Sequence, residues 1–379
     1  MPALATPPPG LRDPRRLLEY GAAAMFVERA RAVAPGFALS DGAGEAVGEI
    51  CRRLDGLPLA IELAAARVPA LGVQAVAARL DDRFRLLTGG SRTALPRQQT
   101  LRAVVDWSWE LLSEPERAML RRLAVFTGGC TLEAAEEVCG PAAIGGPEPP
   151  GGALEVIARL VDKSLLIAAH GEGGEPRYQL LETVRAYAAD RLAEAGEAER
   201  LARAHAERCA GFAERADPQL RGPGQLDWVR RLEADHDNLR AALRWAVAAG
   251  DGALALRLAA PLSWFWYLRG DRHDAAEWLP AALAAGPTAN TSAKARVLFA
   301  SALFRVESGD AKGAAAAWEL AEESRAVAER AGDEVGVAWA DSALGQLAFI
   351  TGDRALAVEV VDRALTAVTA ADRWARPRR

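Results

Sequence analysis

Apolar residues recur at helical spacing along most of the chain, and turn-forming residues separate the helical stretches. After a Pro-rich start, for which we predict an extended or disordered segment, four or five amphipathic stretches follow and predict a small helical bundle. Within one stretch, Gly56 and Pro58 interrupt an otherwise continuous helical pattern. Glycine can adopt the left-handed conformation that ends a helix, and proline suits the first turn of the next one. We therefore predict a tight corner between two helices at residues 56–59, the Gly-Leu-Pro-Leu corner.

The pattern changes beyond this bundle, where two short strands follow three helices. Ser113 and Glu116 form the capping-box pattern at the start of one helix, and Thr131 is placed to cap the next. A third helix and two strands around a glycine-rich turn follow, at residues 153–162, 163–169 and 177–181. Helix–helix–helix–strand–wing–strand is the order of a winged helix.

The rest of the chain is helical and punctuated by a repeated Gly-Asp pair, in which glycine ends one helix and aspartate caps the next. The pairs stand at 250–251, 270–271, 309–310, 332–333 and 352–353. Alternate pairs lie about 40 residues apart, which predicts helical hairpins similar to, and slightly longer than, tetratricopeptide units. The predicted fold is mainly α. Its parts are a Pro-rich linker (1–16), a helical bundle (17–97), a winged helix with a short β-hairpin (98–195) and a helical-hairpin array (196–379).

Two features of this array concern binding partners. An aromatic cluster in the first hairpin is expected to pack in the core, with a peptide-binding groove as the alternative. Its members are Trp264, Phe265, Trp266, Tyr267 and Trp278. Near the end of the chain, four apolar residues are expected to lie on an exposed face and to support self-association. These are Val358, Val361, Leu365 and Val368.

Composition excludes several classes of function. The chain has 379 residues with a net charge of −5, which argues against a protein built to wrap nucleic acid. No apolar run approaches the ~18 residues that a membrane span needs, and no signal-peptide pattern is present, so we expect a cytoplasmic protein. The four cysteines contain no C-x-x-C pair and the four histidines are scattered. We therefore expect free thiols, no metal site and no catalytic residues.

Three stretches together resemble the signal-transduction NTPases that carry an NB-ARC module, most closely the actinobacterial regulators in which winged-helix and tetratricopeptide-like regions follow that module. The stretches are CRRLDGLPLAIELAAAR (51–67), LLTGGSRTALPRQQTLRAVVDWSWELLSEPERAMLRRLAVFTGG (86–129) and RYQLLETVRAYAADRL (177–192). The resemblance identifies the bundle as the family's helical lid domain. It implies that Pro58, with Gly56, Leu57 and Leu59 beside it, lies against the base of a bound nucleotide.

Other parts of the family's nucleotide site are not found in this sequence. No G-x-x-x-x-G-K-[ST] motif occurs, and no apolar strand ends in the paired acids that hold magnesium. We therefore expect no ATP hydrolysis and no cofactor on this chain alone, although the full-length family binds ADP or ATP. A separate P-loop domain would complete the site, and we expect the chain to be the C-terminal part of a longer regulator. The family's Met-His-Asp motif is replaced by Leu180, Leu181 and Glu182, so the implied histidine–phosphate contact is missing.

The favoured function is therefore a regulatory signalling protein: the lid, winged-helix and sensor-repeat part of a nucleotide-switch regulator. It would act by protein–protein interaction, with a protein partner or ligand on the repeats. The alternative is a DNA-binding regulator that uses its winged helix directly. Residues 113–190 carry seven basic and twelve acidic residues, and the presumed recognition helix has one arginine against two acids. DNA contact needs clustered cations, so we do not expect direct DNA binding.

Overall fold

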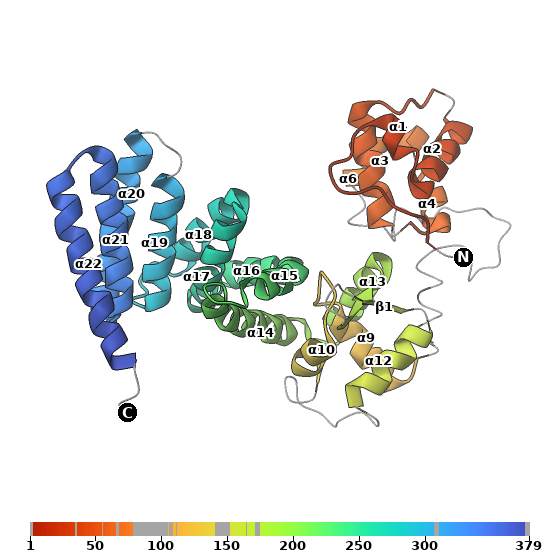
Figure 1. Ribbon diagram of the computed structural model, residues 1–379. Helices are drawn as coiled ribbons and strands as arrows, with labels where there is room; N and C mark the ends of the chain where they lie inside the picture. The colour runs from red at the N-terminus through yellow and green to blue at the C-terminus, as the bar shows by residue number, and fades with distance from the viewer. Residues whose placement is uncertain are drawn as a thin grey trace. The chain divides into compact units, whose positions relative to one another are not determined.

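The computed structural model is mainly helical with one two-stranded sheet (Figure 1). It describes residues 3–34, 36–54, 56–65, 68–78, 105, 109–110, 112–140, 152–163, 165–170, 175–306 and 311–375. The chain divides into two compact units, which are described separately. One unit is Met1–Val125 with Gly129–Ala198, and the other is Phe126–Gly128 with Glu199–Arg379. The predicted helical fold class is confirmed.

The first part of the chain is a bundle of short helices around an apolar core. The helices are α1 (Pro14–Leu17), α2 (Gly21–Val33), α3 (Asp41–Arg53), α4 (Pro58–Ala65), α5 (Val68–Leu71) and α6 (Val73–Ala78). Helix α2 packs against α4, and α3 against α6. Phe26, Ile50, Leu54 and Ile61 are fully buried between them. Ser40 caps α3 by accepting a hydrogen bond from the Ala43 amide.

The Pro-rich start of the chain packs against this bundle in an extended conformation. The Leu4 amide donates to the Gly56 carbonyl at 2.8 Å, and the Ala22 amide donates to the Ala5 carbonyl at 3.1 Å. The Arg52 guanidinium reaches the carbonyls of Pro7 and Pro8 at 3.3 and 3.2 Å. Because the backbone bonds tie the segment to helices far along the chain, residues 4–8 form part of the bundle.

The winged helix has the predicted element order. Its elements are α9 (Glu114–Leu123), α10 (Leu132–Cys139), α12 (Gly152–Asp162), β1 (Leu166–His170), β2 (Pro176–Leu180) and α13 (Glu182–Glu194). The strands pair antiparallel, with Leu166 opposite Leu180. The capping box is confirmed, because Glu116 accepts from the Ser113 amide at 2.8 Å, and Thr131 caps α10 as expected. The predicted helix at 98–112 lies largely outside the described residues.

A partly buried ion cluster links α9 to the turn that follows α13. Glu197 accepts hydrogen bonds from Arg121 at 3.0 Å and Arg122 at 2.9 Å, and its side chain is only 13% exposed. These two guanidiniums, Arg122 first, lower the pKa of Glu197 from an ordinary value of 4.5 to about 2. The carboxylate therefore stays ionised in the folded protein at a pH where the unfolded chain binds a proton.

We expect Glu197→Gln to remove this contribution to stability, about 1–2 kcal/mol once solvent screening is allowed for. Because the pKa of Glu197 is lower in the folded protein than in the unfolded chain, the ionised carboxylate stabilises the fold. This contribution is fully present above about pH 4.5 and is lost as the pH falls toward 2. Acid titration followed by circular dichroism should show the variant losing less stability over that range than the native chain. Glu194→Gln is the control, since Glu194 is 57% exposed beside Arg191. Equal acid sensitivity of the native chain and Glu197→Gln would contradict the prediction.

The second unit is a series of antiparallel helices. They are α14 (Ala198–Gln219), α15 (Gln225–Ala234), α16 (His236–Ala248), α17 (Gly252–Arg269), α18 (Arg272–Ala285), α19 (Ser292–Val306), α20 (Ala311–Ala331), α21 (Glu334–Thr351) and α22 (Arg354–Ala375). Three helical hairpins are formed by α17–α18, α19–α20 and α21–α22, and α17 contacts α19 as α19 contacts α21. The first helices of successive hairpins are therefore neighbours in one layer (Figure 1).

The Gly-Asp pairs form the turns that the sequence predicts. In the four pairs that the structure describes, each glycine has a positive φ and each aspartate accepts a hydrogen bond from the third amide beyond it. The remaining pair, 309–310, lies outside the described residues. Local turn chemistry thus sets where the described hairpins begin and end.

Burial separates the predicted aromatic cluster into two groups. Phe265, Trp266 and Trp278 are at most 4% exposed and lie in the core, which confirms the packing prediction for these three. Trp264 and Tyr267 stack on each other with ring centroids 5.1 Å apart, and Tyr267 is 37% exposed. This second group lies at the edge of a hollow described below.

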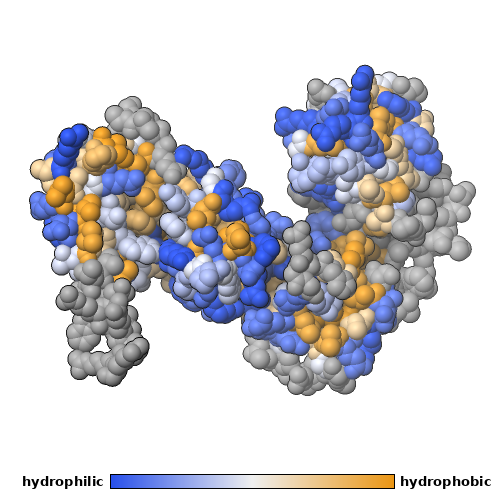
Figure 2. Space-filling model, viewed as in Figure 1, coloured by the Kyte–Doolittle hydropathy of each residue, from blue (hydrophilic) through white to orange (hydrophobic). Residues whose placement is uncertain are grey.

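Apolar side chains also lie exposed on the α21–α22 hairpin, and Figure 2 shows the apolar surface there. Phe349 and Ile350 are exposed in the last turn of α21. On α22, Val358, Val361 and Leu365 are 71, 41 and 59% exposed. The exposed face predicted for α22 is confirmed for these three residues. The side chain of Val368 lies outside the described residues.

The four cysteines are free and buried, each at most 2% exposed. Cys51 lies in the N-terminal bundle, Cys130 and Cys139 in the winged helix, and Cys209 in the helical-hairpin unit. Burial raises the pKa of the Cys51 thiol to about 12 and also raises those of Cys139 and Cys209. Such thiols are poor nucleophiles and act here as small apolar side chains. No helix among the described residues is long and apolar enough to cross a bilayer.

Candidate functional site

The Gly-Leu-Pro-Leu corner has the predicted backbone. Gly56 has φ +65° and follows the end of α3, while Pro58 is the first residue of α4. Leu57 packs partly buried against the bundle core, and the side chain of Leu59 lies outside the described residues. The Leu4 backbone lies directly against Gly56, so that a Cβ at Gly56 would stand 2.0 Å from the Leu4 carbonyl oxygen. Sequence reasoning missed this contact.

The three positions that replace Met-His-Asp have structural roles. Leu180 is buried at the end of β2, and Leu181 precedes α13 as its N-cap residue. Glu182 pairs with Arg185 through two hydrogen bonds of 2.7 Å. Glu182 therefore engages a nearby arginine on the same helix.

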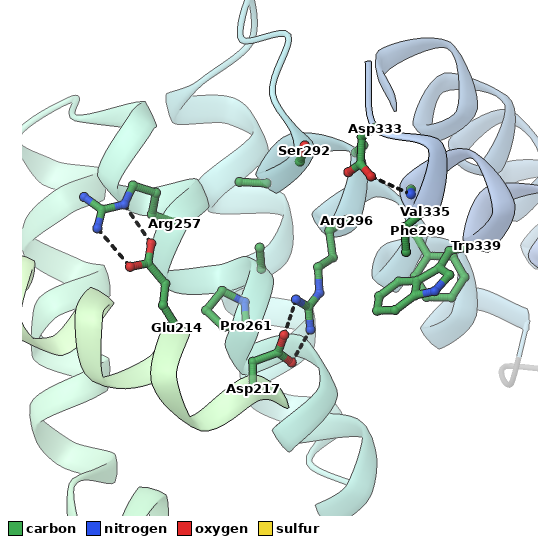
Figure 3. Close-up of a pocket in the computed structure, with 14 residues that line it drawn as sticks. Glu214, Asp217, Arg257, Pro261, Ser292, Arg296, Phe299, Asp333, Val335 and Trp339 are labelled. Carbon is green, nitrogen blue, oxygen red and sulfur yellow. Dashed lines mark hydrogen bonds and ion pairs between the residues drawn. The ribbon is translucent and has the colours of Figure 1, made fainter. Parts of the chain in front are cut away.

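The second unit contains a cavity of about 320 Å³, which we call the groove (Figure 3). It lies among α14, α17, α19 and α21, three of which are the first helices of successive hairpins. Its side chains are charged and aromatic: Glu214, Asp217, Arg257, Arg296, Phe299, Asp333 and Trp339 are among them. A smaller hollow adjoins it and shares Arg296, Phe299 and Trp339.

Ion pairs hold the charged side chains of the groove. Arg296 donates two hydrogen bonds to Asp217, which also accepts one from Arg221 at 2.8 Å. Burial alone would raise the pKa of Asp217, but these two arginines hold that pKa below its ordinary value. Arg257 pairs with Glu214 at 2.8 and 3.1 Å. Both members of that second pair are 44% exposed, so it contributes little to stability.

Aromatic rings and guanidiniums stack along the same wall. The Arg221 guanidinium lies 4.8 Å from the Trp264 ring centre and 5.1 Å from that of Trp339. The Arg296 guanidinium lies 5.2 Å from the centre of the Trp339 ring. The Phe299 ring packs beside the Trp339 ring, with the two ring centroids 5.6 Å apart. Cation–π contacts of this kind favour flat, ordered side-chain arrangements. The charged and aromatic side chains of this wall therefore hold one another in place.

Sequence reasoning did not identify the groove, although one signal was present. Arg257, Arg296 and Trp339 are spaced 39 and 43 residues apart, the same intervals that separate the Gly-Asp pairs at 270, 309 and 352. They are therefore equivalent positions of three successive hairpins. Large polar or aromatic side chains at equivalent positions of a repeat predict a shared face.

One cluster has the composition of a metal site but lacks its electrostatics. Oxygen or nitrogen atoms of His236, Asp271 and Asp274 lie within 4.8 Å of one another. Asp274 is buried and already contacts His236 at 2.6 Å and the Arg240 guanidinium at 3.4 Å. Asp271 caps α18. A fixed guanidinium opposes a bound cation, so we assign the cluster to packing of α16 against α18.

The surface of α12, the helix at the recognition position of the winged helix, is acidic and apolar. Arg159 pairs with Glu155 at 2.8 Å, and Lys163, just beyond the helix, pairs with the buried Glu116 at 2.7 Å. Leu154 is 53% exposed beside Glu155. The cations of α12 are therefore held by acids of the same domain.

Comparisons with known proteins agree with part of this architecture. A family model described as a winged helix-turn-helix domain matches residues 112–193. Over 270 residues the chain is 44% identical to a Mycobacterium tuberculosis protein named "Putative HTH-type transcriptional regulator", covering 70% of this chain and 30% of that protein. It is also 45% identical over 191 residues to an uncharacterized protein of that organism, covering 50% of this chain and 47% of the relative. The chain thus spans less than a third of the first relative's length.

A solved structure is similar at a much lower level. It is a signal-transduction ATPase with numerous domains, with a tetratricopeptide repeat sensor, from Pyrococcus horikoshii. The two share 12% sequence identity over 92% of this chain and 54% of that one, and the TM-score is 0.31. This value is below the level at which two folds are taken to be the same.

Proposed function

We propose that this chain is the lid, winged-helix and sensor part of a regulator of the NB-ARC type, and that it acts by binding rather than by chemistry. The winged-helix match and the relatives named as transcriptional regulators support a regulatory role. The three stretches that resemble the family support the assignment of the lid and of the winged helix, and the spacing of the Gly-Asp pairs supports the tetratricopeptide-like array. Four free, buried thiols fit a protein that works in the reducing cytoplasm.

The charge of α12 is the observation that supports action through protein binding. A recognition helix that reads DNA presents free cations to phosphates and bases. Here Arg159 and Lys163 are engaged by Glu155 and Glu116, and Leu154 lies exposed beside Glu155. An acidic face with an exposed leucine suits a protein contact within the regulator or with a partner. We therefore favour a protein-binding winged helix.

In the proposed regulator, the Gly-Leu-Pro-Leu corner supplies one wall of a nucleotide site. Gly56 and Pro58 hold the corner between α3 and α4, where Pro58, flanked by Gly56, Leu57 and Leu59, would contact the base. A separate P-loop domain would bind the phosphates and magnesium. We propose no hydrolysis by the residues of this chain.

The alternative is a winged helix that binds DNA directly, which the relatives' name favours. A gel-shift titration of the full chain with random duplex DNA at low salt separates the two, since non-specific binding is strongest there. We expect no binding at micromolar protein. The double variant Glu155→Lys with Asp162→Lys, which adds cations to the exposed face of α12, should gain salt-sensitive binding. Micromolar binding by the native chain that Arg159→Gln weakens would establish the DNA-binding alternative.

A further inference from the structure

We infer that the groove of the helical-hairpin unit binds a small organic anion that carries a planar group. The acidic group would lie on Arg257 and Arg296, and the planar group against Trp339 and Phe299. The inference deepens the proposed sensor role by naming the chemistry of the ligand. Its biological meaning rests on that role, whereas the binding itself does not.

The two arginines of the groove keep hydrogen-bond donors that their partner carboxylates do not use. A guanidinium has five N–H donors, so an arginine paired with one carboxylate keeps donors to spare. The Nε atom of Arg296 is buried and has no hydrogen-bond partner. Arg257 uses Nε and Nη2 on Glu214. An acidic group is the ligand chemistry that satisfies such donors.

The carboxylates of the groove are already engaged. Asp217 accepts from both Arg296 and Arg221, and Asp333 accepts from the Gly336 amide as the cap of α21. Glu214 is paired with Arg257. Asp217 is the most fully engaged of the three, and an anion that bonds to the spare N–H groups of Arg257 and Arg296 leaves these contacts in place.

The N-terminal ends of two helices, α19 and α21, line the groove. The first residue of α19, Ser292, lines the cavity, and so do Asp333, Val335 and Gly336 at the start of α21 (Figure 3). The N-terminus of a helix carries a partial positive charge. At α21 the Asp333 carboxylate already accepts from the Gly336 amide, so it is the start of α19 that adds to the attraction that the arginines exert on an anion.

Shape and aromatic rings define the rest of the ligand. A cavity of about 320 Å³ is at the small end of the range for small-molecule sites. The Trp339 and Phe299 rings, tilted by 45° to each other, give an aromatic wall beside the arginines. The groove therefore fits an aromatic carboxylate or an aromatic phosphate monoester.

A panel of probes with one ring system and different charges tests the inference on the full chain. Calorimetric titrations with naphthoate, naphthyl phosphate and naphthylmethylamine compare carboxylate, phosphate and cation. We expect at least one acidic probe to bind at least about tenfold tighter than the amine, and more weakly as salt rises. Inorganic phosphate should bind more weakly than naphthyl phosphate, because it lacks the ring. Equal or tighter binding of the amine, or no binding of either acidic probe, overturns the inference and leaves the regulatory role untouched.

Two substitutions in one ion pair give opposite expectations. Arg257→Gln removes a donor of the site and should weaken the acidic probe about tenfold. Glu214→Gln frees Arg257 from its carboxylate and should strengthen the same probe several-fold. Arg215→Gln, at an exposed arginine of α14 beside Glu214 and outside the groove, is the control and should change nothing. Circular dichroism checks that each variant is folded. A shift of both variants in the same direction shows that the pair acts only through structure, and overturns the site.

Discussion

Replacing Gly56 with alanine should destabilise the N-terminal bundle by about 3 kcal/mol or more. Gly56 has φ +65°, a conformation that costs an alanine about 1–2 kcal/mol. The new methyl group would also lie 2.0 Å from the Leu4 carbonyl oxygen, so the extended segment at residues 4–8 must move away. The hydrogen bond from the Leu4 amide to Gly56 would be lost with it. Faster amide hydrogen exchange in α3 and α4, measured by mass spectrometry, should report the change.

Gly72→Ala in the same bundle is the matched control. Gly72 has φ +74° with no atom within 4 Å of an added Cβ, so it carries the conformational cost without the collision. We expect it to cost about 1–2 kcal/mol. If the two variants destabilise the bundle equally, the Leu4 segment does not support the corner.

The second large effect is expected in self-association, which we predict to occur through α22. Val358, Val361 and Leu365 are spaced three and four residues apart and form one apolar stripe, 41 to 71% exposed. An apolar stripe at this spacing is the pattern of a helix that pairs with a copy of itself about a two-fold axis. Sedimentation velocity should show a concentration-dependent dimer of the full chain. Val358→Lys with Leu365→Lys should weaken the dimer at least about tenfold, because it places charges in the stripe.

The matched control for the stripe is Leu226→Lys in α15. Leu226 is 73% exposed, so the substitution changes the same kind of side chain at a separate place. The dimer should survive it. A native chain that sediments as a monomer at every concentration, or a dimer equally sensitive to Leu226→Lys, would contradict α22 as the contact.

The sequence predicted those features that depend on neighbouring residues. The Gly-Asp turns, the Ser113–Glu116 capping box and the Gly56–Pro58 corner each follow from a few adjacent side chains and their backbone preferences. The winged-helix order was readable for the same reason, since its described helices and strands carry distinct local patterns.

Contacts between distant residues left no such signal. The Leu4 amide and the Gly56 carbonyl meet through backbone atoms that any residue except proline at the donor position could supply. Asp217 and Arg296 are 79 residues apart, and charged residues are too common for one such pair to stand out. The groove could have been found only by comparing equivalent positions of the hairpins.

The buried cysteines give the protein native reporters of local opening. A thiol reagent can modify Cys51, Cys139 or Cys209 only when the surrounding helices separate, because each is at most 2% exposed and has a raised pKa. These residues lie in the bundle, the winged helix and the hairpin unit respectively. Labelling rates resolved by peptide would therefore give a separate opening free energy for each part of one unmodified chain. They would show which part loosens first.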